Sequence, residues 1–521
     1  MPSGSCRLEN GQSVSFSKVP CLPFDEFRQE IIDSVQLGIR ISSFFGIPDL
    51  DRTDEENGSI RLVVVLADDV EKALGVISTK VKKSYPSLTP FCPQVHMFER
   101  ELAEQWGVVP DGHPWLRPAR FQPPLQRKST DKIPSPINAP LPGVADFFRI
   151  QGEEIHEVAV GPVHAGVIEP GHFRFQCHGE KVFHLEISLG YQHRGIERAL
   201  IGGPHKRTLF QIETTAGDTT VGHTIAYSQA IESLKGCQIS QRAQAIRAIG
   251  LELERLANHT GDLGALSSDV GFLPTASYCG RIRGDFLNMT ALLCGSRLGR
   301  GLIRPGGVGF DIDSDERLQK LINALSRAEE DSRVAIELLW DTPAVLSRFE
   351  NTGVVSRKAC HDLGLVGPSA RASGSELDVR RDFPLGQYRV TKIPPIPDPK
   401  EKTGDVAARA YVRKEEIKNS INFLKELLPQ IPSGPALLPD FRNPSNGLPA
   451  NSLVVSLVEG WRGEICHTAI TDSQGRFLLY KIVDPSFHNW IGLGMALRNQ
   501  EISDFPLCNK SFNLSYCGFD L

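Results

Sequence analysis

Apolar residues recur at intervals of three and four over several long stretches of the chain. In residues 240–266, Ile246, Ile249, Leu253 and Leu256 form one stripe, and charged side chains occupy the other faces. This spacing is typical of an amphipathic helix. The same periodicity predicts two further helices, over residues 314–339 and 412–431.

A second pattern, short alternation of apolar and polar residues broken by glycines, flanks these helical stretches. It occupies residues 149–191 and returns near the end of the chain, over 451–483. Alternation of this kind predicts antiparallel strands. The larger part of the chain is therefore expected to be a mainly helical core with β-rich flaps at both ends.

The first hundred residues follow a different plan. Residues 24–47 read as a helical opening, 59–69 as a strand, and the following stretch as a helix that ends near Lys82. These elements predict a small α/β unit, so the fold class of the whole chain is α+β.

A segment in which proline and polar residues displace hydrophobic ones separates the two parts. It covers residues 121–143, and such a composition favours an extended linker. With 521 residues the chain exceeds the size at which one core stops growing, so more than one domain is expected. The predicted domains are therefore 1–120 and 144–521, joined by the linker.

Composition and charge describe an ordinary globular protein: 40% of the residues are hydrophobic and the formal net charge is −5. No concentrated basic face is evident, so nucleic acid is not an expected partner. The first ten residues lack the charged start and apolar core of a signal peptide, and no apolar run approaches the length of a membrane span. The chain is expected in the cytoplasm, with any membrane association coming through partners.

Eleven cysteines are spread along the chain, and no two of them form Cys-x-x-Cys. Thiolate metal sites usually draw at least one ligand pair from such a spacing, so free reduced thiols are expected. The glycine-rich phosphate cradles G-x-G-x-x-G and G-x-x-x-x-G-K-[ST] are also absent, which argues against NAD or ATP bound in the usual way.

Three stretches carry candidate chemistry, each with a plain structural alternative. The glycine- and proline-rich turn at 161–175 contains His164 and His172, and a histidine titrates near pH 6.5, so either could donate a proton over a cavity or simply form hydrogen bonds at the surface. Residues 363–384 are too rich in glycine, serine and arginine for a core element and predict a long irregular loop, often a functional feature. Further titratable groups, which could equally form structural ion pairs, are His193, Arg194, His259, Asp262 and Asp269.

Five motifs occur in an order that matches one known family: "GPVHAGVIEPGHFRF", "YQHRGIER", "LELERLANHTGDLGAL", "GLVGPSARASG" and "VEGWRGEICH". They resemble successive motifs of the 49 kDa-type subunit of respiratory complex I and of the large subunit of group 4 energy-converting nickel-iron hydrogenases, as in formate hydrogenlyase. "MFERELAEQWGVVPDGHPWLRP" resembles the end of the 30 kDa-type subunit of complex I. The resemblance covers nearly the whole chain apart from the linker.

The family's hydrogenases hold nickel and iron with two Cys-x-x-Cys pairs, because thiolates are the soft ligands such a site needs. The first pair would fall at Ala216 and Thr219, and the second at Ser515 and Gly518, with Cys517 one residue out of register. The resemblance therefore implies a pocket that has lost its metal, and no metal is expected in this chain. Two further residues match the surroundings of that former metal pocket: His223 follows the first pair, and Arg462 matches the arginine over the metal.

In complex I the corresponding empty site forms part of a quinone cavity. His172 matches the turn histidine at its head, and Asp269 matches the helix aspartate, so the two are the expected catalytic pair. The tyrosine that completes the family's headgroup site falls near Gly217, where this chain departs from the family. His193, Arg194 and His259 match residues beside the terminal 4Fe-4S cluster of a neighbouring subunit, where a cation and an imidazole can couple electron arrival to proton uptake.

The resemblance thus implies a subunit of a membrane-bound complex related to hydrogenases and complex I. Its partners would be a small iron-sulfur subunit and ion-translocating membrane subunits, and its acceptor a quinone or another small molecule; the chain itself would bind no cofactor. The alternative is an inert scaffold that docks the iron-sulfur subunit onto the membrane arm. A working nickel-iron hydrogenase is disfavoured, because alanine and glycine have no ligating side chain.

Overall fold

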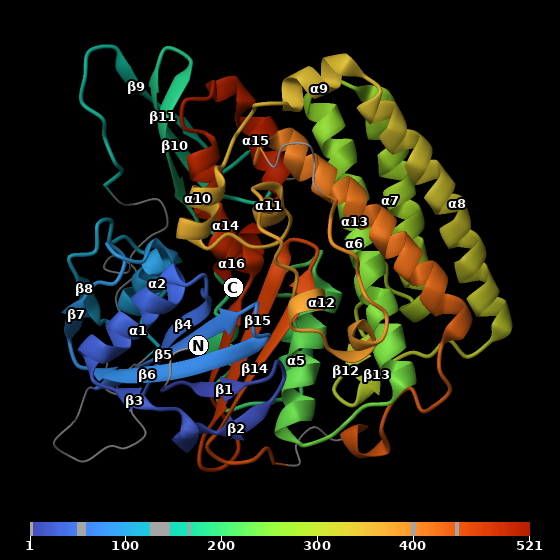
Figure 1. Cartoon of the computed structure of the whole chain (residues 1–521), viewed down its shortest axis with the longest axis horizontal. Coiled ribbons are helices and arrows are strands. Elements are labelled where there is room, and N and C mark those ends of the chain that lie inside the picture. Colours follow the sequence, from blue (N-terminus) through green and yellow to red (C-terminus); the bar gives the residue numbers. More distant parts are fainter. Residues whose placement is uncertain (1–3, 49–58, 126–145, 165–167, 398–402, 443–446) are drawn as a thin grey trace.

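The fold is described from a computed structural model, over residues 4–48, 59–125, 146–164, 168–397, 403–442 and 447–521 (Figure 1). The N-terminal unit is built on a sheet in the order β1-β6-β5-β4, with β3 added in parallel to β6. The long strands are buried along almost their whole length, as strands covered on both faces are. The bounds are β1 (Cys6–Leu8), β3 (Cys21–Leu22), α1 (Phe24–Gln36), β4 (Arg40–Pro48), β5 (Ile60–Asp68), β6 (Ala73–Val81) and α2 (His96–Trp106), with β7 (Ser84–Pro86) and β8 (Val109–Asp111) forming a small parallel pair.

A four-stranded sheet lies at the centre of the molecule, in the order β16-β15-β14-β2. Its edge strand β2 (Ser13–Ser15) comes from the N-terminal unit, whereas β14 (Ser452–Gly460), β15 (Gly463–Thr471) and β16 (Phe477–Val483) come from the end of the chain. Every residue of β14 and β15 is buried, so this sheet is an interior element. The first and last parts of the sequence therefore share one sheet.

Long helices pack side by side on one flank of this sheet (Figure 1). Helix α5 (Thr220–Leu234) contacts the sheet directly, and α6 (Gln241–Asp269) packs against α7 (Leu273–Cys294) and α13 (Val406–Leu427). Helix α8 (Asp315–Trp340) covers α7 on the outside. The main hydrophobic core continues from these helices into the N-terminal unit.

A three-stranded sheet projects from the opposite side of the molecule (Figure 1). Its strands β9 (Ile155–Val160), β10 (His172–His178) and β11 (Lys181–Ser188) are antiparallel. Short helices lie around and between the sheets and the long helices (Figure 1). They are α3 (Ile196–Leu200), α4 (Thr208–Glu213), α9 (Pro343–Phe349), α10 (Arg357–Leu363), α11 (Gly367–Ala372), α12 (Val379–Asp382), α14 (Pro485–Ala496), α15 (Phe505–Phe512) and α16 (Tyr516–Asp520), with a small hairpin of β12 (Ile303–Arg304) and β13 (Gly307–Val308).

The structure confirms the α+β class, the three long predicted helices and the strands predicted at both ends of the larger part. It corrects the N-terminal reading in two places. The stretch before Lys82 is strand β6 rather than a helix, and the predicted opening helix stops at Gln36, after which β4 begins. Pairing with β5 and burial inside the packed sheet override the local resemblance of these segments to a helix.

Two smaller expectations also meet the structure. Residues 363–384 are not one long irregular loop, because α11 and α12 lie within them. The domain boundaries stay a prediction, and most of the expected linker lies outside the described residues.

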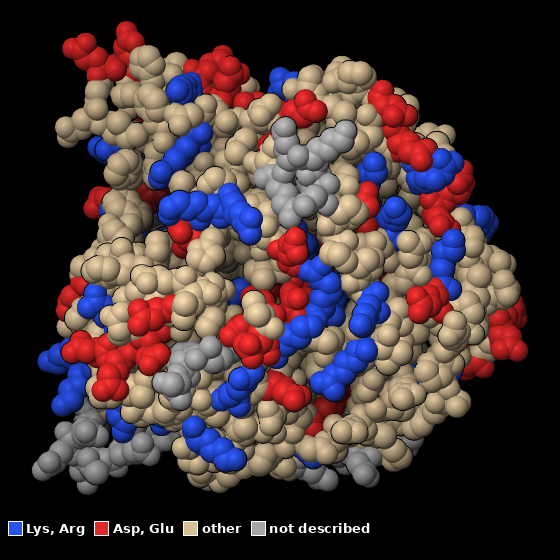
Figure 2. Space-filling model, viewed as in Figure 1, with Lys and Arg blue, Asp and Glu red and all other residues tan. Residues whose placement is uncertain are grey.

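Basic and acidic side chains alternate across the middle of the face in Figure 2. Within the described ranges, no helix combines the length and the apolar character needed to cross a bilayer.

Candidate functional site

The two segments that correspond to the family's cysteine pairs lie against each other at the end of the central sheet. Ala216 and Thr219 precede α5, and Ser515 and Gly518 stand at the start of α16. The Gly217 backbone N–H bonds to the thiol of Cys517, which joins the two segments directly. Burial and the Glu169 carboxyl raise the pKa of Cys517 to about 11, so this thiol stays protonated near neutral pH.

Two arginines bridge the same pair of segments. Arg462, at the β14–β15 turn, forms a bidentate ion pair with Asp218 at 2.7 Å for both contacts and donates from Nε to the Asn513 carbonyl at 2.5 Å. Arg194 donates from Nη2 to the carbonyls of Thr215 and Cys517, at 2.9 and 3.0 Å. Forked guanidiniums suit this role because each holds several acceptors in a fixed geometry.

A chain of buried polar side chains runs inward from the former metal pocket. His223 Nε2 lies 3.0 Å from Asp484 Oδ2, and His223 Nδ1 lies 3.1 Å from His467 Nε2. His467 Nδ1 in turn lies 2.9 Å from the Tyr480 hydroxyl. Hydrogen bonds pointing from Tyr480 through both imidazoles to Asp484 satisfy every ring nitrogen with neutral histidines. Against its burial, the hydrogen bond from His223 lowers the pKa of Asp484, so this end of the chain is a carboxylate.

Asp484 also occupies the space next to the fourth ligand position. A Cβ placed on Gly518 would lie 2.7 Å from Asp484 Cγ and 2.9 Å from Ser515 Oγ, closer than such atoms approach. Ser515 Oγ accepts a hydrogen bond from the Gly518 backbone N–H and so caps α16. The residues present therefore do not fit a nickel-iron centre: the thiols are missing and the room for one of them is filled.

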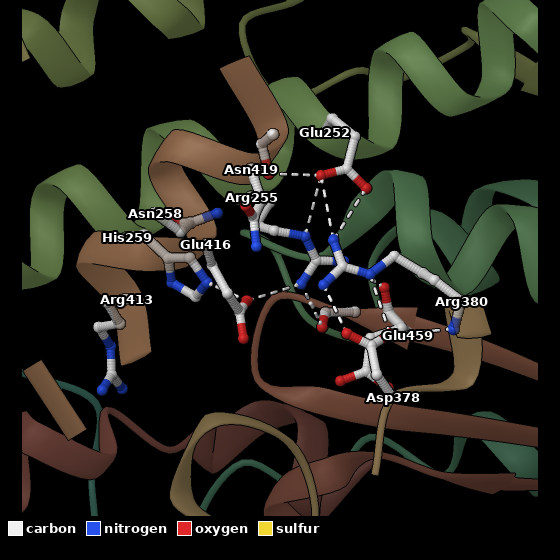
Figure 3. A network of polar contacts seen from close by, with 12 residues as sticks. Glu252, Arg255, Asn258, His259, Asp378, Arg380, Arg413, Glu416, Asn419 and Glu459 are labelled. Carbon is white, nitrogen blue, oxygen red and sulfur yellow. Dashed lines mark hydrogen bonds and ion pairs between the residues drawn. The ribbon is translucent and has the colours of Figure 1, made fainter. Parts of the chain in front are cut away.

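His259 lies apart from this pocket, in a buried cluster of ion pairs (Figure 3). Its Nε2 is 2.8 Å from Oε2 of Glu416 on α13, and Glu416 also pairs with Arg255 and Arg371. Burial lowers the pKa of His259, although Glu416 opposes the effect, so the ring is neutral near pH 7. His259 and Arg462 are linked through Trp461: the His259 ring meets Trp461 edge-on at 6.1 Å, and the Arg462 guanidinium stacks on Trp461 at 3.9 Å.

The expected pair beside a partner's cluster, His193 and Arg194, lies at the edge of the former metal pocket. His193 Nδ1 is 2.7 Å from the Asp520 carbonyl oxygen. Arg194 is exposed and bonds only to carbonyl oxygens, and no carboxylate pairs with it among the described residues. Its positive charge is thus left uncompensated on the surface, whereas His259 lies inside and makes no contact with it.

The two residues of the expected catalytic pair make no direct contact with each other among the described residues. His172 is buried at the start of β10, 3.1 Å from the Gly161 carbonyl oxygen and in contact with Phe147. Asp269 is exposed at the last turn of α6, and no hydrogen bond or ion pair joins it to His172 among the described residues. The earlier aspartate of the same helix, Asp262, is the buried one and pairs with Arg413 at 2.7 Å. The roles expected of His172 and Asp269 stay predictions.

Several residues of these sites escaped the sequence reasoning: Asp218, Glu254, Glu416, His467, Tyr480 and Asp484. A weak signal existed for some of them, since Asp218 lies between the two ligand positions and His467 is the last residue of the motif that contains Arg462. Glu416 looked like one of many charges on a helix. In the described part of the chain, no group of three or more histidine, cysteine, aspartate or glutamate side chains is arranged to hold a metal ion.

Glu254 offers a pH-dependent test of the pocket's surroundings. Its carboxyl accepts hydrogen bonds from the backbone N–H groups of Val221 and Gly222 at 2.7 and 3.2 Å, yet burial raises its pKa to about 8. The unfolded value is about 4.3, so the folded chain binds the extra proton between these two pH values. This contribution to stability is complete below the unfolded pKa and is lost as the pH rises towards 8.

We therefore expect the Glu254→Gln variant to lose a slope of about 1.4 kcal/mol per pH unit in the free energy of unfolding between roughly pH 5 and 8. Urea unfolding of both proteins over that pH range measures it. Parallel pH profiles of the two proteins would contradict a protonated Glu254.

Comparisons with known families and proteins agree with this architecture. Residues 269–446 match the family described as respiratory-chain NADH dehydrogenase, 49 Kd subunit, and residues 36–129 match its 30 Kd subunit. The chain is 32% identical over 363 residues to the carbon monoxide-induced hydrogenase of Rhodospirillum rubrum, which covers 69% of this chain and 97% of the relative. It is 29% identical over 445 residues to formate hydrogenlyase subunit 5 of Escherichia coli K12, covering 84% of this chain and 76% of the relative.

A solved structure supports the fold. The chain resembles a subunit in the structure of the membrane-bound sulfane sulfur reductase, an archaeal respiratory membrane complex, with a TM-score of 0.65 and 24% identity. The similarity covers 71% of this chain and 99% of the other.

Proposed function

This chain belongs to the family that unites the 49 kDa-type subunit of respiratory-chain NADH dehydrogenase with the large subunits of energy-converting hydrogenases, and we propose that it works without a nickel-iron centre in a membrane-bound complex of that type. It receives electrons from an iron-sulfur cluster in a small neighbouring subunit. It couples their arrival to ion translocation by membrane subunits, from a position on the cytoplasmic face of the membrane.

The observation that carries the proposal is the state of the former metal pocket. Ala216, Thr219, Ser515 and Gly518 offer no thiolate, and Asp484 fills the room beside Gly518. The pocket is held closed by side chains of this chain instead, through the Arg462–Asp218 ion pair and the hydrogen bonds of Arg194. Such satisfied polar groups stabilise a scaffold in place of metal bonds.

Electron arrival would act on this chain through charge. Arg194 presents a positive charge with no carboxylate partner among the described residues, which favours an anionic or reducible group facing it. Added negative charge on a neighbouring cluster raises the pKa of nearby histidines, here His193 first. His223 and His467 then offer hydrogen-bonded positions along which a proton can move.

The acceptor would be a quinone or another small molecule reached from the turn that carries His172, with Asp269 as the second titratable group. His172 is held by the Gly161 carbonyl and lies next to Arg174, whose Nε is 3.4 Å from His172 Nε2.

Metal analysis of the intact complex and of the isolated chain tests this function. We expect iron but no nickel in the complex, and neither metal in the isolated chain, because the clusters belong to partners. Stoichiometric nickel in the isolated chain would overturn the proposal and restore a hydrogenase.

An inert scaffold is the second candidate, favoured because no hydrogen bond or ion pair joins His172 to Asp269 among the described residues. The His172→Gln variant in the assembled complex distinguishes the two. If the variant complex assembles but loses its electron-transfer turnover, the chain does more than dock a partner. If turnover is unchanged, the scaffold role is favoured.

A further inference from the structure

Buried ion pairs surround His259 and together carry unequal charge (Figure 3), and the Arg413–Asp262 pair stands beside the others without an ion pair to them among the described residues. Their members come from α6, α11, α12, α13 and β14, and their charged side chains are almost completely buried. The four guanidiniums belong to Arg255, Arg371, Arg380 and Arg413, and the five carboxyls to Glu252, Asp262, Asp378, Glu416 and Glu459.

Among these described residues, carboxyls therefore outnumber guanidiniums by one. A buried charge without a partner is costly in the interior, and a group in that position usually takes up or loses a proton instead. One proton on one carboxyl, with His259 neutral, makes the cluster neutral.

Four of the carboxyls are strongly held as anions by their partners. Asp378 receives two hydrogen bonds from the Arg380 guanidinium, at 3.0 and 2.7 Å. Glu252 accepts bonds from two hydroxyl groups in addition to its ion pairs, and Asp262 pairs with Arg413 and accepts a bond from Asn513. Glu416 is shared by two arginines, and against its burial they hold its pKa well below the usual range.

Glu459 has fewer hydrogen-bond and ion-pair partners than Glu252, Asp378 and Glu416. It has one guanidinium contact, from Arg371 Nη1 at 2.8 Å, and accepts one backbone N–H, from Val379 at 3.1 Å. Burial, opposed by Arg371 and reinforced by Asp378, raises its pKa. The charged groups acting on it from the packed elements are Arg255 of α6, Arg371 of α11, and Asp378 and Arg380 of α12, and its cross-strand partner on β15 is Glu464.

Glu459 also reaches a cavity. A space of about 410 Å³ opens between α5, α6, β14 and the segment after α12, and Glu459 lines it together with Arg380 and Tyr388. The other four carboxyls of the cluster do not line this cavity. Its volume holds several water molecules, so a proton on Glu459 can exchange with solvent.

His259 is poorly suited to hold the proton at rest. Its Nε2–H donates to Glu416, and its buried Nδ1 has no partner among the described residues. A second proton, on Nδ1, would be a buried donor without an acceptor, which costs about 1–3 kcal/mol.

We propose that Glu459 carries the proton that neutralises this cluster, and that it releases this proton into the cavity whenever His259 becomes protonated. Two different protons are involved. The O–H bond at Glu459 breaks and its proton enters the cavity, while an N–H bond forms between another proton and His259. The cluster therefore stays neutral. Glu459 is then a positioning residue that sets how readily His259 takes up a proton. The inference deepens the proposed function and rests on it for the event that protonates His259.

Infrared spectroscopy of the full chain tests the resting state. We expect the Glu459→Gln variant to lose one C=O stretching band of a protonated carboxyl that exchanges in D₂O. The Glu464→Gln variant is the matched control: Glu464 lies opposite Glu459 across β14 and β15 and is equally buried, but Arg40 lowers its pKa against burial, so this variant keeps the band. A spectrum unchanged in Glu459→Gln would overturn the proposal.

The coupling is tested by nuclear magnetic resonance of labelled histidine in wild type and in Glu459→Gln. Wild-type His259 can draw on the charge that Glu459 releases, so the variant should show a lower pKa for His259. An equal or higher pKa in the variant would overturn the coupling. Because both measurements use the chain alone, failure of the proposed function in the assembled complex would leave their outcome unaffected.

Discussion

The Glu416→Ala variant is expected to lose about 3–5 kcal/mol of unfolding free energy, because it breaks the buried charge cluster at its most connected point. Glu416 binds Arg255, Arg371 and His259 with no exposed surface on its side chain. Its removal takes one carboxylate partner from Arg255 and one from Arg371, and it leaves the buried Nε2–H of His259 without its acceptor. Urea unfolding, followed by circular dichroism, measures the loss.

A matched control exists at a surface ion pair between α13 and the neighbouring helix α8. Glu329 of α8 pairs with Lys425 of α13 at 2.9 Å, and both side chains are partly exposed. Water screens such a pair, so Glu329→Ala should cost about 0–1 kcal/mol. Similar losses in the two variants would show that the cluster around Glu416 contributes no more than a surface ion pair.

The Lys481→Met variant is expected to loosen the contact between the N-terminal unit and the rest of the chain, at a cost of about 3–5 kcal/mol. Lys481 Nζ lies 2.6 Å from Glu101 of α2 and 2.9 Å from Glu197 of α3. Arg120 also pairs with Glu101 and donates to the Phe519 carbonyl. Without Lys481, two buried carboxylates would share the single guanidinium of Arg120.

Hydrogen exchange locates this effect. We expect faster exchange in α2 and β16 of Lys481→Met, together with a lower midpoint of thermal unfolding. The exposed Lys425→Met variant serves as the control. It should change the free energy of unfolding by no more than about 1 kcal/mol and leave exchange in α2 and β16 as in wild type. Faster exchange spread evenly over the whole chain would argue against a local role at this junction.

Burial lowers the pKa of Lys481 to about 8, although the Glu197 carboxylate opposes this effect. Next to Phe519, the Asp520 carboxyl accepts a hydrogen bond from the backbone N–H of Gly190 at 2.7 Å. Gly190 begins the segment that leads to His193 and Arg194. The junction between the two units and the edge that carries His193 and Arg194 are therefore built on one set of contacts. A substitution at the junction is therefore expected to alter the edge with His193 and Arg194, and the reverse is also expected.

The sequence by itself determined the long elements of this protein. The period of apolar residues located α6, α8 and α13, and alternation located the strands at both ends of the larger part, because burial of one face imposes these periods locally. The sequence also showed that the four thiolate ligands of a nickel-iron centre are missing. The order of the motifs places these ligand positions at Ala216, Thr219, Ser515 and Gly518. Where local pattern was ambiguous, as before Lys82, the sheet decided between helix and strand.

Only the tertiary structure decided which charges act together. Asp262 and Asp269 stand on one helix seven residues apart, and packing against α13 buries the first and leaves the second exposed. Glu416, the partner of His259, comes from a segment more than a hundred residues away along the chain. Asp484, which fills the space beside Gly518, comes from about thirty residues away. Ion pairs and buried hydrogen bonds depend on distances of a few ångströms between such segments, and these distances are set by packing of the whole chain rather than by any local period.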